Sequence, residues 1–223
     1  MASVIRLPRM DRPVRQVAGA LERRWHGTFE IDEWGFDREL HGVAVTVAGI
    51  GWDVQVGGAD HLPPSGGALL VGNVRGWFTP LVVAHAVHRA TRRAVRFTGL
   101  PDVAPLGPAL RKIGGVLARA DEVEGLLRAG HVVGVWCRTE RQSSRAGEVP
   151  VDLVRTALAA EVPVIPVATL GAMLGRTWRV ELGPAVPQPQ LRGPLADLDL
   201  ADEARDGVQR LLDEATPPRW LLG

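Results

Sequence analysis

The sequence contains one cysteine, Cys137, and one lysine, Lys112, among its 26 basic residues. A single cysteine excludes an intramolecular disulfide and a zinc site built on cysteines, so a reducing cytoplasm is the expected compartment. No apolar run reaches the ~18 residues that would predict a bilayer-spanning helix. The N-terminus also lacks the continuous apolar stretch of a signal peptide, and we therefore expect a cytoplasmic protein.

The charge is nearly balanced, since the 223 residues carry a net charge of +1. This balance argues against a dedicated nucleic-acid-binding protein, which would be strongly basic over the whole domain. The hydrophobic content of 46% suits one domain with an additional arm. The arm differs in character, since residues 1–26 hold six arginines against two acidic residues, a net charge of +4, which leaves −3 for the remainder.

Residues 13–25 predict an amphipathic helix with Asp11 as N-cap and Pro13 in the first turn. Its apolar positions recur with helical spacing: Val14, Val17, Ala18, Leu21 and Trp25. One interpretation is a surface helix packed on its own domain. The other is a helix that lies on an anionic membrane surface, which would place the protein peripherally on the inner membrane face.

The rest of the chain alternates short apolar runs with helical patterns, which predicts an α/β fold with a mainly parallel sheet flanked by helices. The predicted strands are Ala68–Gly72, Val95–Thr98, His131–Trp136, Val162–Ala168 and Trp178–Leu182. The predicted helices are Thr79–Arg89, Gly107–Ile113, Asp121–Arg128, Val151–Ala160 and a terminal one near Ala201–Glu214. We divide the chain into an N-terminal helical arm, residues 1–42, and a domain, residues 43–223.

The region before this alternation is harder to interpret. Ile31–Asp37 is acidic and aromatic and is expected to lead into a short helix. Two β-rich runs follow, Val43–Val47 and Trp52–Val56, separated by a glycine-containing break. They predict either a hairpin or an end strand followed by a core strand.

Four short blocks carry the functional information. The first is Gly72-Asn73-Val74-Arg75-Gly76-Trp77-Phe78-Thr79-Pro80, and the second is Gly114-Gly115-Val116-Leu117-Ala118-Arg119. The third is Trp136-Cys137-Arg138-Thr139-Glu140-Arg141, and the fourth is Val162-Pro163-Val164-Ile165-Pro166. In order and spacing they resemble the phospholipid/glycerol acyltransferases, lysophosphatidate acyltransferase-like proteins that move a fatty acyl group from a thioester to a hydroxyl. The resemblance covers roughly residues 52–185.

The resemblance implies a catalytic histidine and aspartate in block one, and this sequence has neither. The histidine position is Val74 and the aspartate position is Thr79. A hydroxyl attacks a thioester poorly unless a base removes its proton, and valine accepts no proton. Thr79 cannot replace a carboxylate that orients an imidazole and stabilises its charged form. The resemblance therefore implies an impaired catalytic site, and whether the chain is an enzyme stays open.

The resemblance also implies substrate-binding positions at Asn73, Arg75, Trp77, Arg119, Arg138 and Arg141. Block three has Arg138 where the family has glutamate, so positive charge would gather near Arg119 and Arg141. An anion site for the phosphate of the acceptor is one interpretation. A solvated basic loop, in which Arg138, Arg141 and Arg145 pair with Glu140 and Glu148, is the other.

Other titratable side chains offer no evident replacement base. His85 and His88 follow on the helix after block one, about 16 and 21 Å along its axis from position 74. We interpret them as core or surface histidines and expect no metal site. Cys137 ends a strand, where a thiol could accept an acyl group, but a small buried thiol is the simpler interpretation. His131 lies about 20 Å from it along the strand, so the two do not form a dyad.

Three functional hypotheses remain. The first is an impaired family member that binds an acyl thioester or (lyso)phospholipid, at an apolar groove beside Val74 and Trp77. The second is an active acyltransferase with an atypical site, and the third is a regulatory or structural subunit of an active paralogue. We expect no bound cofactor, with acyl-CoA or acyl carrier protein as the co-substrate. The expected partners are that thioester or lysophospholipid, a carrier protein or paralogue, and a membrane surface through residues 13–25, with no nucleic acid.

Overall fold

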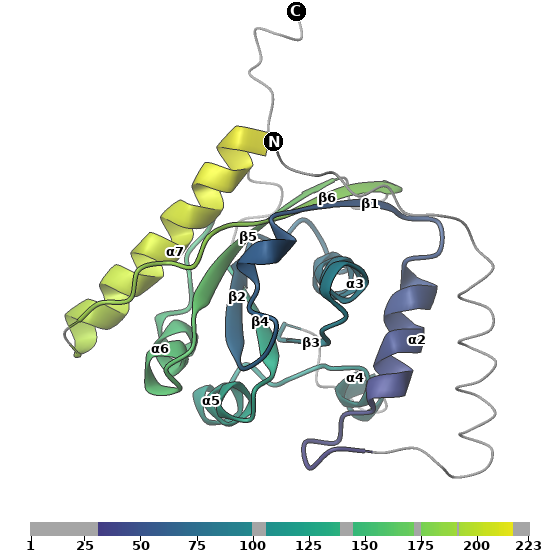
Figure 1. The fold of residues 1–223 in the computed structure, drawn as a ribbon, viewed down its shortest axis with the longest axis horizontal. Helices are drawn as coiled ribbons and strands as arrows, with labels where there is room; N and C mark the ends of the chain where they lie inside the picture. The colour runs from purple at the N-terminus through teal and green to yellow at the C-terminus, as the bar shows by residue number, and fades with distance from the viewer. Residues whose placement is uncertain (1–30, 100–105, 139–144, 172–174, 191, 216–223) are drawn as a thin grey trace, which may run out of the picture.

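The computed structural model describes residues 31–99, 106–138, 145–171, 175–190 and 192–215 (Figure 1). The predicted helix over residues 13–25 lies outside them. The strands are β1 (Asp53–Gly57), β2 (Ala68–Gly72), β3 (Val95–Phe97), β4 (Val132–Trp136), β5 (Val164–Gly171) and β6 (Thr177–Leu182). The helices are α2 (Arg38–Ala48), α3 (Thr79–Thr91), α4 (Leu106–Lys112), α5 (Ala120–Arg128), α6 (Val151–Ala159) and α7 (Pro194–Ala215), with a short 3₁₀ turn at Ala59–His61.

The strands of the described chain form one six-stranded sheet in the order β1-β6-β5-β2-β4-β3. Neighbouring strands are parallel except β5 and β6, which are antiparallel. Every residue of β2 and β4 is buried, as expected for apolar strands covered on both faces. Helix α3 covers one face, and α5, α6 and α7 cover the other (Figure 1). The predicted α/β fold with a mainly parallel sheet is confirmed.

No helix in the described parts of the chain combines the length and the apolar character needed to cross a bilayer. The longest, α7, is strongly charged along one face and begins at Pro194 rather than near Ala201, where we predicted it.

The prediction of a strand over Val43–Val47 is wrong, because these residues form the second half of helix α2. Asp37 caps this helix, since its Oδ1 accepts the N–H of Leu40 at 2.8 Å. His41 and Val45, one helical turn apart, are both completely buried. The cap and this buried face therefore outweigh the β preference of the valines. Helix α2 also runs across residues 42 and 43, where we placed the boundary between arm and domain.

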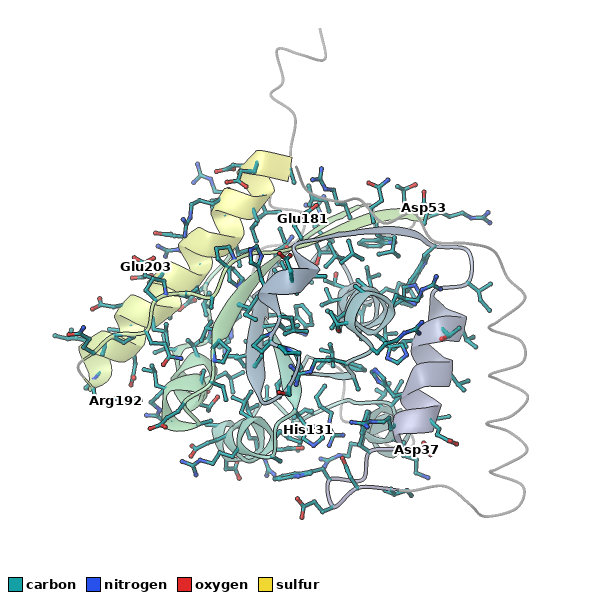
Figure 2. All side chains as sticks on the ribbon, viewed as in Figure 1. Asp37, Asp53, His131, Glu181, Arg192 and Glu203 are labelled. Atoms are coloured by element: carbon teal, nitrogen blue, oxygen red, sulfur yellow. The ribbon has the colours of Figure 1, made fainter. Side chains whose placement is uncertain are left out.

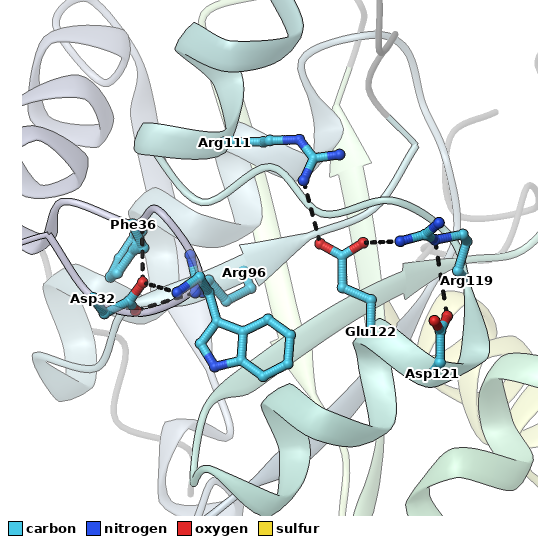
Figure 3. Close-up of polar contacts among 8 residues, drawn as sticks. Asp32, Phe36, Arg96, Arg111, Arg119, Asp121 and Glu122 are labelled. Atoms are coloured by element: carbon cyan, nitrogen blue, oxygen red, sulfur yellow. Dashed lines mark hydrogen bonds and ion pairs between the residues drawn. The ribbon is translucent and has the colours of Figure 1, made fainter.

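The acidic and aromatic segment Ile31–Asp37 forms a turn ahead of α2 that holds a buried arginine (Figure 3). Asp32 accepts the N–H groups of Trp34 and Phe36 and pairs with Arg96 at 3.1 Å. The Arg96 guanidinium also lies 4.2 Å from the centre of the Phe36 ring. Burial lowers the pKa of Arg96 to about 10, whereas Asp32 raises it, so the arginine stays charged at neutral pH. The turn thus provides the charge partner that a buried cation on β3 requires.

Histidines hold α2 against α3 and against the end of α4. His41 Nδ1 lies 2.6 Å from the Ile113 carbonyl oxygen, and His85 Nδ1 lies 2.6 Å from that of Val45. The rings of His41 and His88 lie edge to face, 6.0 Å apart. Each of the two Nδ1 atoms that meets a carbonyl must donate a proton, which leaves His41 Nε2 buried without a partner in the described chain.

These histidines predict that acid destabilises the fold. Burial, with smaller contributions from the nearby His88, Arg96 and Arg38, lowers the pKa of His41 from 6.5 to about 4, against the opposing effect of its bond to the Ile113 carbonyl. The pKa values of His85 and His88 are lowered for the same reason. Stability is therefore complete above pH 6.5 and falls as the pH approaches 4, because the unfolded chain binds protons that the folded chain excludes. His41 alone should cost about 3 kcal/mol over this interval.

Urea denaturation across this pH range tests the prediction. The variant His41→Asn keeps a donor for the Ile113 carbonyl and removes the titration. Its free energy of unfolding should depend less steeply on pH than that of the native chain. Parallel pH curves for the two proteins would show that His41 does not carry the effect.

Candidate functional site

The topology brings three of the four sequence blocks to the carboxyl ends of parallel strands. Strands β2, β4 and β5 are parallel neighbours, and the register pairs Gly72 with both Trp136 and Val167. Blocks one and three therefore meet where β2 and β4 end, whereas block four lies at the start of β5, beside Leu69–Val71. Block two lies beside β3, since Gly115 forms a parallel bridge with Phe97. In open α/β sheets such carboxyl ends are the usual place for a ligand site.

Asn73 follows β2 and connects it to β5. Its Oδ1 accepts the N–H of Thr169 at 2.7 Å, and its Nδ2 donates to the Thr169 carbonyl at 3.0 Å. The side-chain amide thus bonds both backbone groups of Thr169, in the place that a further residue of β2 would occupy. Asn73 is 2% exposed. Its amide therefore holds the strand ends together, whereas the sequence predicted contact with substrate.

Thr79 holds the loop between β2 and α3. Its buried Oγ1 accepts the N–H of Arg75 at 2.9 Å and the N–H of Gly76 at 3.1 Å. Its own N–H donates to the Gly76 carbonyl at 3.1 Å. A carboxylate at this position could accept the same two N–H groups. Thr79 therefore retains an architectural role that an aspartate could fill, without the negative charge.

Removing this acceptor should weaken the fold. We expect Thr79→Val to lower the free energy of unfolding by about 1–3 kcal/mol, because two loop N–H groups lose their partner. Thr79→Ser keeps the hydroxyl and should cost less than half as much. Chemical denaturation monitored by circular dichroism gives both values. Equal losses for the two variants would mean that the hydroxyl does not support the loop.

Val74 and Trp77, the positions predicted to line an apolar groove, differ in exposure. Val74 is half-buried and packs on the core between the sheet and α3. Trp77 is 68% exposed. Between them, Arg75 is half-buried and its Nε lies 3.4 Å from the Gly171 carbonyl oxygen. Valine at position 74 places an aliphatic side chain where the family pattern has an imidazole.

A buried aromatic ring, that of Trp136, lies at the end of β4. The indole of Trp136 lies so close to Gly72 and Gly134 that a Cβ on either would come within about 3.0 Å of its ring. Its Nε1 donates to the Thr98 carbonyl at 2.9 Å. The glycines of β2 and β4 thus make room for a ring that packs across both strands in the core and is only 8% exposed, at the place where the family pattern has phenylalanine.

The predicted basic residues Arg119 and Arg138 both lie at the surface. Arg119 is largely exposed and faces Asp121 and Glu122 at 3.8 and 3.9 Å (Figure 3). Arg138 is also exposed, and its backbone forms a bridge with Glu148. Arg141 lies outside the described residues. The anion site proposed from block three stays a prediction.

None of the histidines in the described chain stands in for the missing base. His85 is buried against Val45, and His61 Nδ1 lies 2.8 Å from the Leu182 carbonyl oxygen. His131 precedes β4, at the opposite end of that strand from Trp136. The described residues contain no group of three or more metal-ligating side chains.

Cys137 is buried, and burial raises the pKa of its thiol to about 11. A thiol with that pKa carries almost no thiolate at neutral pH and is a poor acyl acceptor.

Sequence reasoning missed several side chains around this edge. Trp178 of β6 is buried, and its ring lies 6.4 Å from that of Trp52, which in turn lies 6.1 Å from that of Phe78. Thr169 Oγ1 is buried with no hydrogen-bond partner among the described residues. The only signal for the aromatic group is composition, because Trp52, Phe78 and Trp178 are far apart in the sequence and meet only through the fold.

The fold resembles that of a solved acyltransferase. No family model matches the chain. The crystal structure of the 1-acyl-sn-glycerophosphate (LPA) acyltransferase PlsC from Thermotoga maritima superposes with a TM-score of 0.62 and 16% identity, over 93% of this chain and 100% of that one. At this identity the likeness concerns the fold, and the chain therefore has an acyltransferase-like fold.

Mycobacterial proteins resemble the chain in sequence. It is 26% identical over 230 residues to an uncharacterized protein of Mycobacterium leprae, covering 89% of this chain and 63% of that protein. Uncharacterized proteins of Mycobacterium bovis and Mycobacterium tuberculosis are also 26% identical, over 86% of this chain and 62% of theirs. The chain thus spans somewhat under two thirds of the length of these relatives.

Proposed function

We propose that this chain binds an acyl thioester or a lysophospholipid at the ends of β2, β4 and β5 without transferring the acyl group. The observation that carries the proposal is the state of the loop after β2. Its architecture is complete, with Asn73 bonded to Thr169 and Thr79 bonded to two loop N–H groups. Its chemistry is not, because the position that needs a base is Val74.

The missing base decides against efficient acyl transfer. Attack of a hydroxyl on a thioester requires that its proton leave as the new bond forms, and a positioned base typically contributes ~10²–10⁴ in rate. The side chains at the two motif positions, Val74 and Thr79, cannot take that proton at neutral pH. Cys137 is buried and protonated, so an acyl-enzyme route through it is not supported either.

Features around the loop suit a lipid-like ligand. The half-buried Val74 and the exposed Trp77 present apolar side chains directly after β2, and the buried ring of Trp136 lies at the end of the neighbouring strand β4. Arg75 brings positive charge to the same loop, which suits a phosphate or the polar end of coenzyme A. The donor would be acyl-CoA or acyl carrier protein.

A reversion experiment tests this proposal. Purified native chain and the double variant Val74→His/Thr79→Asp are assayed with radiolabelled acyl-CoA and lysophosphatidate. We expect the native chain to match the no-protein background and the double variant to gain turnover. The matched control is Val74→His/Thr79→Asn, which has the imidazole and a side chain of aspartate's shape, but no carboxylate to stabilise the imidazolium. Its rate should fall well below that of the double variant.

Two outcomes would overturn the proposal. Turnover by the native chain well above background would mean that another group acts as the base. A double variant that unfolds cooperatively like the native chain, yet stays inactive, would mean that the strand ends no longer accept the two substrates.

A further inference from the structure

Exposed apolar side chains gather at one corner of the described molecule, where the end of α2 meets the start of α3. Val47 and Ile50, at and just after the end of α2, are 47% and 54% exposed. Trp77 and Phe78, just before α3, are 68% and 47% exposed. Together with the half-buried Trp52, whose ring contacts that of Phe78, Trp77 and Phe78 form what we call the aromatic corner. An exposed apolar group of this kind is informative because large rings rarely stay in water without a partner.

Contacts with the core and with the backbone hold the aromatic corner in place. The Trp52 ring lies 6.1 Å from that of Phe78 and 6.4 Å from that of the buried Trp178, so the exposed rings are continuous with the core. Thr79 Oγ1 bonds the loop N–H groups directly before Trp77. The end of α2 is fixed on α3 by the contact between His85 Nδ1 and the Val45 carbonyl oxygen. These contacts keep the rings from folding back onto the protein.

Basic side chains flank the corner. Arg75 lies on the same loop, two residues before Trp77, and bonds the Gly171 carbonyl. The exposed Arg176 is joined to the corner through its carbonyl oxygen, which accepts the N–H of Asp53 at 2.7 Å. Asp53, beside Trp52 at the start of β1, is the opposing charge (Figure 2). Tryptophan flanked by arginine is typical of a surface that lies at the boundary between anionic headgroups and acyl chains.

We propose that the aromatic corner docks this protein on the surface of an anionic phospholipid bilayer. The inference rests on the proposed function, because Trp77 is only three residues from Val74 and docking would bring the strand ends to the source of the lipid. A second copy of the chain is a poorer occupant. The few exposed side chains of the corner offer much less than the ~800 Å² that each partner buries in a stable dimer.

Vesicle flotation of the full chain tests this surface. The variant Trp77→Ser/Phe78→Ser removes the exposed rings, and serine at position 78 suits the N-cap of α3. The matched control is Leu195→Ser/Leu198→Ser, which removes two exposed leucines of α7, 77% and 48% exposed. Vesicles of phosphatidylcholine alone are compared with vesicles of phosphatidylcholine and phosphatidylglycerol in equal parts, at low and high salt.

We expect the native chain and the leucine variant to float with the anionic vesicles, more at low salt than at high salt. The Trp77/Phe78 variant should lose roughly tenfold or more of its vesicle partition. Equal flotation of this variant and the native chain, or no flotation of the native chain, would overturn the proposal. So would a dimer in light scattering that only this variant abolishes, because the corner would then be a contact between copies.

This experiment contains no acyl donor, so its result is separate from that of the reversion assay. Flotation that depends on Trp77 and Phe78 in a chain that the reversion leaves inactive would support the docking surface and reject the ligand site. Equal flotation of the native chain and the Trp77/Phe78 variant, together with turnover gained by the reversion, would support the ligand site and reject the docking surface.

Discussion

Strand β2 ends in the interior of the sheet, between β5 and β4, and the chain that leaves it must find new hydrogen-bond partners there. The side chains of Asn73 and Thr79 solve this problem. Asn73 bonds both backbone groups of Thr169, and Thr79 accepts two N–H groups of the loop. The start of α3, the position of Val74 and the exposure of Trp77 all follow from how this loop is held. Buried backbone N–H and C=O groups without hydrogen-bond partners would destabilise the folded state.

The hydrogen bonds that hold this loop do not involve the side chain at position 74. A histidine at position 74 would serve the reaction and is not needed for the loop, whose hydrogen bonds come from neighbouring residues. An aspartate at position 79 would serve both, and threonine keeps the acceptor while losing the charge. The hydrogen bonds of the loop therefore need neither a histidine at position 74 nor a carboxylate at position 79. The fold likeness to an LPA acyltransferase at 16% identity is consistent with such a scaffold.

Local patterns predicted much of this structure and missed what depends on tertiary contacts. The apolar run Ala68–Gly72 gave a strand with the right bounds, because a short segment buried on both faces has a simple signature. Val43–Val47 was taken for a strand because β-branched residues favour one. The Asp37 cap and the burial of Val45 decide otherwise. Blocks one to three lie near the carboxyl ends of the strands, but their sequences did not predict that the Asn73 amide bonds the backbone of Thr169 or that Arg119 faces acidic residues of α5.

The central claim is that the strand ends still bind a ligand although the base is gone. Isothermal titration calorimetry of the purified native chain with lysophosphatidate, below the concentration at which it forms micelles, tests that claim most directly. The Val74→His/Thr79→Asp variant serves as reference. We expect saturable binding by both proteins, with dissociation constants within a few-fold of each other. Binding by the variant alone, or by neither protein, would contradict it.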